Sequence, residues 1–202
     1  MERAAWTAGI GALWAFGYFS LGARDSLRHQ ADLTTAIDAW IPFVGWTIWP
    51  YLFGIAFSLT PLVAVRCHRL FRLVAVGYVV VITVSLTCFA VFPVTSTELR
   101  LNPAALDIDP ISKWAIMALH ALDTSSNLFP SLHVSLAALA AFSIWKAAPR
   151  WRLLAVTSAA TVAISVCTVK QHVVFDVVGG LALAAVAYTF IFRSYCPSKV
   201  IH

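Results

Sequence analysis

Charged residues are scarce in this chain of 202 residues: Asp, Glu, Lys and Arg together make up 11% of it, whereas hydrophobic residues make up 60%. Ordinary soluble domains carry about 25% charged and about 45–50% apolar residues. The shortage of charge therefore excludes a soluble cytosolic enzyme, and the high hydrophobicity excludes intrinsic disorder. The net charge is +5, but the basic residues lie in short groups between apolar runs. They do not form the single basic face of a nucleic-acid-binding protein.

Paired cysteines are also missing. The chain has four cysteines, Cys67, Cys88, Cys167 and Cys196, and none of them forms a Cys-x-x-Cys motif. Two of the four lie inside apolar runs. The sequence therefore indicates neither a disulfide framework nor a zinc site. It has no His-x-x-x-His or Glu-x-x-His spacing either, so we predict no metal and no cofactor. We find no internal repeat and no second domain, and expect one domain over 1–202 with its core in 37–192. No clear Gly-x-x-x-Gly face decides between a monomer and a homo-oligomer.

Long apolar runs are what the chain does have. A helix needs about 20 apolar residues to cross the hydrocarbon core of a bilayer, and an open sheet edge cannot face lipid. We therefore predict an all-α polytopic membrane protein with six transmembrane helices, at Ala4–Leu21, Ile41–Val65, Leu73–Val94, Ser131–Ala147, Leu153–Val169 and Val173–Phe192. The first run could instead be a signal peptide, but it is longer than a usual signal core, and we favour an uncleaved helix.

The loops between these runs divide the charge unequally. One side would carry nine basic residues and one acid, and the other five basic residues and eight acids. Since basic loops face the cytoplasm, we predict that both termini are cytoplasmic, in the inner membrane of a cell. On the outer side, Asp109-Pro110 is typical of a helix start, so we expect 111–122 to be a short interfacial helix with Trp114 at headgroup level. Residues 25–39 could form a second one.

Polar residues that could do chemistry gather at the outer ends of the predicted spans. His172 and Asp176 are four residues apart, so their side chains share a helix face. The carboxylate could accept a hydrogen bond from one imidazole nitrogen and leave the other free as a nucleophile or base. His133 begins another span at the same level, where helix amides favour phosphate. Taken one at a time, each group could equally be an ordinary structural polar residue of a membrane bundle.

The combination resembles the type 2 phosphatidic acid phosphatase superfamily, which comprises integral-membrane lipid phosphatases and phosphotransferases. The second motif of that superfamily, Pro-Ser-Gly-His, is similar to Pro130-Ser131-Leu132-His133 here. The third, Ser-Arg-x5-His-x3-Asp, is similar to the segment from Ser165 to Asp176, with Val166 in the place of arginine. The first, Lys-x6-Arg-Pro, is poorly matched: Arg100 is a plausible arginine, but Leu101 follows it. These departures look like the branch related to inositol phosphorylceramide synthases.

The resemblance implies a metal-independent mechanism on a lipid phosphate in the bilayer. His172 would attack phosphorus and form a phosphohistidine intermediate, Asp176 would orient it, and His133 would protonate the leaving alcohol. The phosphoryl oxygens would be held at the start of the fourth span and by two cations, that is, by Ser131, Leu132, Arg100 and Lys170. Water as acceptor makes a phosphatase, and a lipid or sugar hydroxyl makes a head-group phosphotransferase. A small transporter or channel, or an inactive scaffold, remains the alternative from another class.

Overall fold

The computed structural model describes residues 2–23, 29–96, 99–123, 126–193 and 195. The described chain is almost entirely helical, as predicted. Its α-helices are α1 (Glu2–Gly22), α2 (Ala36–Trp40), α3 (Ile48–Ala64), α4 (His68–Val91), α5 (Pro110–Leu122), α6 (Leu132–Ala147), α7 (Arg152–Thr168) and α8 (Val174–Phe192). Short 3-10 turns lie at Gly45–Thr47, Pro103–Ala105 and Pro149–Trp151. The two-residue strands β1 (Ala31–Asp32) and β2 (Val94–Thr95) pair in parallel.

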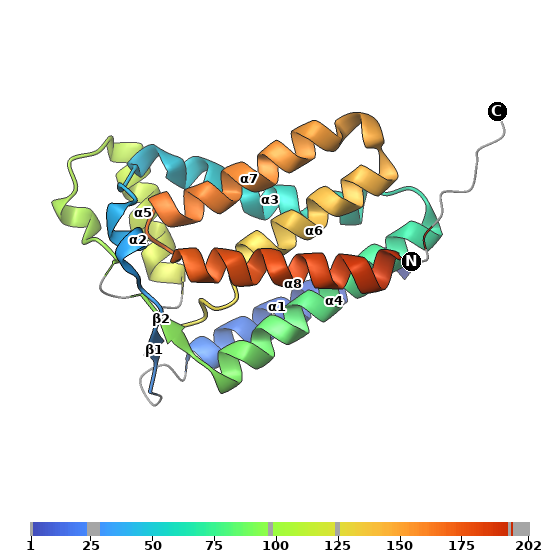
Figure 1. Cartoon of the computed structure of the whole chain (residues 1–202), viewed down its shortest axis with the longest axis horizontal. Helices are drawn as coiled ribbons and strands as arrows, with labels where there is room; N and C mark the ends of the chain where they lie inside the picture. Colours follow the sequence, from blue (N-terminus) through green and yellow to red (C-terminus); the bar gives the residue numbers. More distant parts are fainter. Residues whose placement is uncertain (1, 24–28, 97–98, 124–125, 194, 196–202) are drawn as a thin grey trace.

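The long helices run side by side along the long axis of the molecule (Figure 1). Helix α6 lies at the centre and packs against α7, α8, α3 and α4, while α1 packs on α4. The short elements α2, α5, β1 and β2 gather at one end of the bundle (Figure 1). Helix α1 begins and α8 ends at the opposite end. The end with the short elements, which we call the loop end, contains the predicted site residues.

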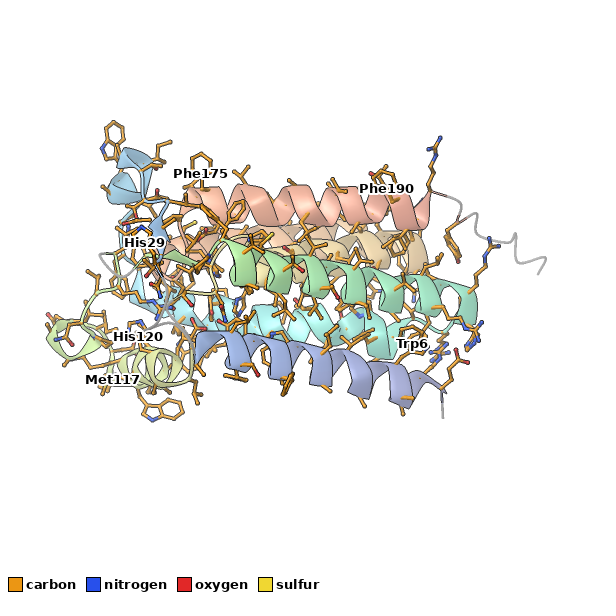
Figure 2. All side chains as sticks on the ribbon, turned by 90° about the horizontal axis from the view of Figure 1, so that it is seen from below. Trp6, His29, Met117, His120, Phe175 and Phe190 are labelled. Carbon is orange, nitrogen blue, oxygen red and sulfur yellow. The ribbon has the colours of Figure 1, made fainter. Side chains whose placement is uncertain are left out.

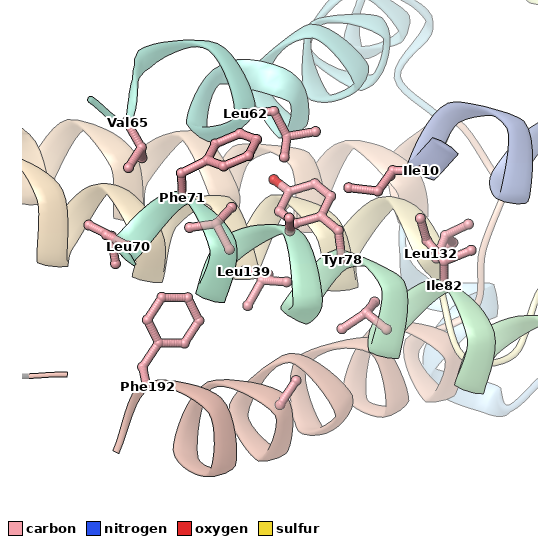
Figure 3. Close-up of a cluster of buried hydrophobic side chains, with 14 of the residues drawn as sticks. Ile10, Leu62, Val65, Leu70, Phe71, Tyr78, Ile82, Leu132, Leu139 and Phe192 are labelled. Atoms are coloured by element: carbon pink, nitrogen blue, oxygen red, sulfur yellow. The ribbon is translucent and has the colours of Figure 1, made fainter. Parts of the chain in front are cut away.

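The core of one half of the bundle is built around α4 (Figure 3). Phe71 and Tyr78 of this helix are almost completely buried, and Leu139 of α6 and Phe192 of α8 pack against the same cluster. Because α4 is apolar on most of its circumference, one side of it can pack in the core while valines such as Val76, Val80 and Val84 remain on the outer surface. The second half has its own cluster of α3, α6 and α7 side chains.

Four of the six predicted spans meet the length and composition expected of a membrane helix. They are Gly45–Ala64, His68–Val91, Pro149–Thr168 and Val174–Phe192. Helix α6 is apolar but shorter, and α1, which contains polar residues and several glycines, is not among the four. The structure therefore supports a helical membrane protein but does not confirm the count of six.

The outer surface of the bundle fits lipid. Phe175 and Phe190 project outward from opposite ends of α8 (Figure 2), with exposed fractions of 55% and 79%. Charge lies at the ends instead. At the end opposite the loop end, Glu2 accepts a 2.8 Å hydrogen bond from Nε of Arg72 and lies 3.1 Å from Nε2 of His68.

The helix predicted at 111–122 is present as α5, Pro110–Leu122. The carboxylate of Asp109 accepts a 2.8 Å hydrogen bond from the backbone N–H of Ser112, so it caps the helix as expected. Trp114 is 68% exposed. The suggested helix at 25–39 is shorter than expected, because the chain forms β1 first and turns into α2 only at Ala36. Residues 25–28 of that suggestion lie outside the described residues.

Candidate functional site

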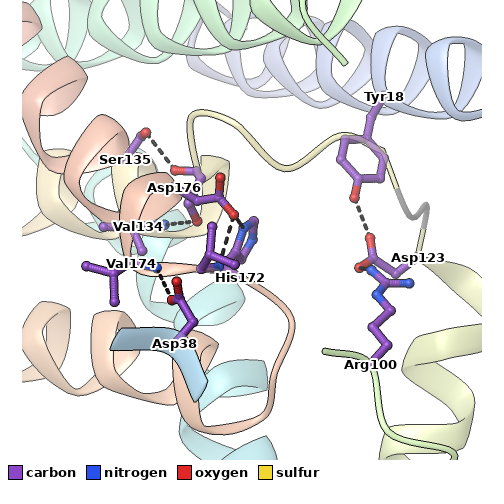
Figure 4. Close-up of polar contacts among 11 residues, drawn as sticks. Tyr18, Asp38, Arg100, Asp123, Val134, Ser135, His172, Val174 and Asp176 are labelled. Atoms are coloured by element: carbon purple, nitrogen blue, oxygen red, sulfur yellow. Dashed lines mark hydrogen bonds and ion pairs between the residues drawn. The ribbon is translucent and has the colours of Figure 1, made fainter. Parts of the chain in front are cut away.

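His172 lies in the connection between α7 and α8, immediately before the N-terminus of α8 (Figure 4). Its Nδ1 atom is 3.2 Å from Oδ2 of Asp176, and both side chains are buried. The same carboxylate oxygen accepts a 3.1 Å hydrogen bond from the backbone N–H of Val173. Because a carboxylate only accepts, Nδ1 carries the proton and Nε2 is left with its lone pair.

His133 lies in the first turn of α6 and faces the same region. The centroids of the His133 and His172 rings are 6.0 Å apart, in an edge-to-face arrangement. The ring of His133 also contacts the ring of Tyr51, which is fully buried in α3, with centroids 4.6 Å apart and the planes tilted by 35°. The sequence predicted that the two histidines lie at the same height along the bundle, and their rings are adjacent. The structure adds the aromatic ring of Tyr51, which limits how the His133 ring can turn.

A close approach of α6 and α8 brings the two histidine-bearing segments together. The backbone N–H of Ser131 donates a 3.0 Å hydrogen bond to the carbonyl of Asp176. A Cβ atom on Gly180 would lie 2.7 Å from the carbonyl oxygen of Ser131, so only glycine allows this separation. The side chain of Ser131 is buried and caps α6 by accepting from the N–H of Val134 at 3.4 Å.

Lys170 and Asp38 connect the loop before His172 to helix α2. Nζ of Lys170 donates to the backbone carbonyls of Asp38, at 2.7 Å, and of Ile41. The carboxylate of Asp38 in turn accepts a 2.7 Å hydrogen bond from the N–H of Val174, at the start of α8. Burial raises the pKa of Asp38, but hydrogen bonds from Thr35 and Val174 and the charge of Lys170 outweigh it and hold that pKa below its usual value.

Arg100, Asp123 and Tyr18 form a second polar group at the loop end (Figure 4). Nη2 of Arg100 is 3.1 Å from Oδ2 of Asp123, and the side chains are only 12% and 11% exposed. The hydroxyl of Tyr18, from α1, donates to the other oxygen of that carboxylate. Nδ2 of Asn127 donates to the backbone carbonyl of Tyr18 at 2.8 Å. The guanidinium of Arg100 is therefore held in place by a chain of contacts that starts on α1.

His120 and Gln171 make a further contact beside the histidine pair. Nε2 of Gln171, whose side chain is fully buried, lies 2.9 Å from Nε2 of His120 at the end of α5. The amide NH2 of Gln171 donates, so Nε2 of His120 accepts. Burial and the nearby guanidinium of Arg100 lower the pKa of His120, and Asp123 opposes them. The environment of His120 therefore favours its neutral form.

A cavity of about 490 Å³ opens from the histidine pair into the bundle. Its polar end is lined by His133, His172, Asp123, Asn127 and Tyr51, and the remainder is lined almost entirely by apolar side chains of α1, α3, α4 and α5. Leu132 lines it beside His133. A phosphate at the polar end would thus have an apolar chamber directly below it.

The structure brings some of the predicted site residues together and separates others. His133, His172 and Leu132 line the cavity, Asp176 lies behind His172, and Arg100 reaches the polar end through Asp123. The side chains of Ser131 and Lys170 are engaged with α6 and α2 respectively. Among the described residues, no group of three or more His, Cys, Asp or Glu side chains is placed to hold a metal ion.

Several polar residues around the site were not predicted as part of it: Tyr18, Tyr51, Asp38 and Gln171. Tyr18 and Tyr51 lie near the outer ends of apolar runs, where aromatic residues commonly form an interfacial belt. Their sequence positions carried no signal of a contact with Asp123 or His133. Gln171 was visible only as the neighbour of His172.

A helical bundle of membrane character, with a carboxylate-bound histidine facing a second histidine above an apolar cavity, is the class of protein that the fold and the site define. A family model described as "PAP2 superfamily" matches residues 27–190. The chain belongs to this superfamily. Neither the curated proteins nor the solved structures contain a match to it. Membership supports a function of the phosphatase or phosphotransferase type.

Proposed function

We propose that the protein is a metal-independent lipid phosphate phosphatase that works through a phosphohistidine intermediate. The observation that carries the proposal is the contact of Nδ1 of His172 with Asp176, which leaves the lone pair of Nε2 available. The ring of the second histidine, His133, lies next to that of His172, with 6.0 Å between the two ring centroids. A nucleophile, a residue that orients it and a proton donor are the three parts that phosphoryl transfer through a covalent intermediate needs.

In the first step, Nε2 of His172 attacks phosphorus and the bond from phosphorus to the lipid oxygen breaks. The proton on Nδ1 stays hydrogen-bonded to Asp176, whose negative charge stabilises the cationic ring that forms. His133 gives its proton to the leaving lipid oxygen, so that the lipid departs as a neutral alcohol. The negative charge of the bound phosphate favours the protonated form of His133 before this step.

In the second step, His133 takes a proton from a water molecule as the water oxygen attacks the phosphohistidine. The bond between phosphorus and Nε2 breaks, inorganic phosphate leaves, and both histidines return to their starting states. The guanidinium of Arg100 supplies positive charge for the phosphoryl oxygens. Its contact with Asp123, which lines the cavity, keeps it at the polar end.

We place this site on the outer side of the membrane. The loop end carries Asp107, Asp109 and Asp123, whereas the opposite end carries Arg66, Arg69 and Arg72. Basic loops remain in the cytoplasm during insertion, so the acidic loop end faces outward. The lipid phosphate would then be hydrolysed at the outer leaflet.

The first test is phosphate release by the purified protein in the presence of a chelator. The panel contains phosphatidic acid, phosphatidylglycerol phosphate, a polyprenyl diphosphate and sphingolipid phosphates. We expect release from at least one of them, and loss of release in His172→Ala. The matched control is His68→Ala, because His68 is exposed at the opposite end of the bundle. Phosphate release by His172→Ala at the wild-type rate would overturn the mechanism.

The second candidate function is transfer of a phosphorylated head group to an alcohol. The observation that favours it is Val166, which stands in the position of the third-motif arginine and is completely buried in the α3, α6 and α7 cluster. The resemblance to the branch related to inositol phosphorylceramide synthases rests on such departures. If no member of the panel releases phosphate, the same lipids are tested with inositol, diacylglycerol and ceramide as acceptors, and with phospholipids as donors.

A further inference from the structure

The apolar part of the cavity lies between α1 and α3. Helix α1 packs mainly on α4, and α3 packs mainly on α6 and α7, so α4 forms the back of the space between them. Thr7, Gly11 and Tyr18 line it from α1, and Tyr51, Ser58 and Leu62 line it from α3. The residues that match the family model begin at 27, so the wall contributed by α1 lies outside the matched region.

The polar atoms along this cavity below the histidines are few. The hydroxyl of Tyr78 lines it but donates a hydrogen bond to the backbone carbonyl of Ser58. Ile10, Leu62 and Ile82 make up much of the remaining wall, and each is at least nine-tenths buried. A wall of this composition favours a hydrocarbon occupant over water.

The depth of the cavity matches one leaflet of a membrane. On α1 it extends from Phe19 to Thr7, and on α3 from Tyr51 to Leu62, which is about 18 Å and about 16 Å at ~1.5 Å rise per residue. The hydrocarbon core of a bilayer is about 30 Å thick. A chain that hangs from a phosphate at the histidine pair would therefore lie in the cavity through about half of the core.

The side of the cavity is open to the surrounding lipid. Trp14 and Phe19 of α1 line it with exposed fractions of 38% and 48%, and Ile55 and Leu59 of α3 line it with 46% and 50%. These half-exposed apolar side chains lie on the two sides of one lateral opening, those of α1 on one side and those of α3 on the other. A lipid could enter from the outer leaflet without lifting its chain out of the hydrocarbon.

We propose that this cavity binds the hydrocarbon chain of the substrate lipid, and that the α1 wall at Gly11 sets the length of chain that the enzyme accepts. The proposal rests on the proposed function for the position of the head group. Gly11 leaves space at this wall, because a Cβ atom there would meet nothing within 4 Å. A longer side chain at this position would occupy the lower cavity without displacing a neighbouring residue.

The chain offers a matched control on the same helix. Gly9 is also exposed, and a Cβ atom on it would likewise meet nothing within 4 Å. It does not line the cavity but a separate hollow beside Trp6 and Val79. Gly9→Leu and Gly11→Leu therefore change helix propensity equally but differ in whether the new side chain enters the proposed chain site.

The experiment compares octyl phosphate with hexadecyl phosphate as substrates of the full chain in lipid nanodiscs. We expect the wild type to have the higher kcat/KM for hexadecyl phosphate. In Gly11→Leu the ratio of kcat/KM for the long chain over the short chain should fall about tenfold, which corresponds to about two methylene groups that no longer fit. In Gly9→Leu the ratio should stay at the wild-type value. Equal ratios in all three proteins would overturn the chain site and leave the phosphatase intact.

A binding measurement separates failure of this proposal from failure of the proposed function. The affinities of the same two phosphates are measured by calorimetry on His172→Ala protein, with and without Gly11→Leu or Gly9→Leu. If the wild type releases no phosphate, the proposed function fails. The chain site still stands if the preference for the long chain is lost only with Gly11→Leu. It is overturned if that preference is absent or survives the substitution.

Discussion

Nδ1 of His172 and Oδ2 of Asp176 are 3.2 Å apart, and both side chains are buried. The carboxylate oxygen is also held by the N–H of Val173, and the backbone carbonyl of Asp176 accepts from the N–H of Ser131. Asp176 thus connects the start of α8 to the start of α6, while His172 lines the cavity.

We expect Asp176→Asn to lower kcat by about 10² to 10⁴, because the amide neither fixes the Nδ1 proton nor stabilises a cationic ring. The measurement is phosphate release at saturating substrate, with the thermal midpoint recorded alongside. Asp107→Asn, at an exposed position of the loop end, is the control and should keep wild-type activity. An active Asp176→Asn enzyme would remove the carboxylate from the mechanism.

Lys170→Met should destabilise the protein rather than weaken phosphate binding. Lys170 is 8% exposed, and its ammonium donates hydrogen bonds to the carbonyls of Asp38 and Ile41. Its loss leaves these carbonyls without their donor, at a cost of about 1–3 kcal/mol in the free energy of unfolding. The measurement is the thermal midpoint in detergent, compared with Lys113→Met at a more exposed position. An unchanged midpoint with a raised KM would instead support the phosphate-binding role that the sequence suggested.

Tyr18→Phe should raise KM for the lipid phosphate several-fold while the thermal midpoint changes little. The substitution removes only the hydroxyl that donates to Asp123, so the carboxylate gains freedom to move with the guanidinium of Arg100. Tyr188→Phe, near the end of α8 that lies opposite the loop end, is the control. A purely structural role of Tyr18 would lower the midpoint and leave KM unaltered in the molecules that remain folded.

The contact of His120 with Gln171 should weaken in acid. The pKa of His120 is lowered in the folded protein by burial and by Arg100, so folding favours the neutral ring. Its contribution to stability is present above the usual value of about 6.5 and is lost as the pH falls through the lower folded-state value. We expect the difference in thermal midpoint between wild type and His120→Asn to shrink from pH 7.5 to pH 5. A difference that grows over this range would contradict the sign.

Local patterns in the sequence predicted the local structure well. Asp109-Pro110 predicted the start of α5, and the capping hydrogen bond to Ser112 confirms it. The spacing of four between His172 and Asp176 predicted that their side chains could meet, and they do, although His172 lies just before α8 and not on a face of that helix. Such predictions succeed because cap and i,i+4 geometry depend only on a few neighbouring residues.

Contacts between distant segments could not be predicted in this way. The sequence indicates that Lys170 is a free cation near the site, yet Nζ donates a hydrogen bond to the carbonyl of Asp38 in α2, more than a hundred residues earlier in the chain. Tyr18 and Asp123 are similarly distant, and Tyr18 reads as an ordinary aromatic residue at a span end. Which polar groups pair across a bundle depends on how the helices are rotated and tilted. Uniformly apolar runs such as these do not indicate the rotation or the tilt of a helix.

The sequence by itself predicted a nearly all-α membrane protein and singled out His133, His172 and Asp176 as the candidate site, because hydrophobic length and short-range spacing are properties of the chain alone. Only the tertiary structure decided that Lys170 is bonded to α2, that Asp123 and Tyr18 hold Arg100, and that an apolar cavity descends from the histidines along α1. The reason is that a cavity is a property of the space between helices, and this space exists only after they have packed.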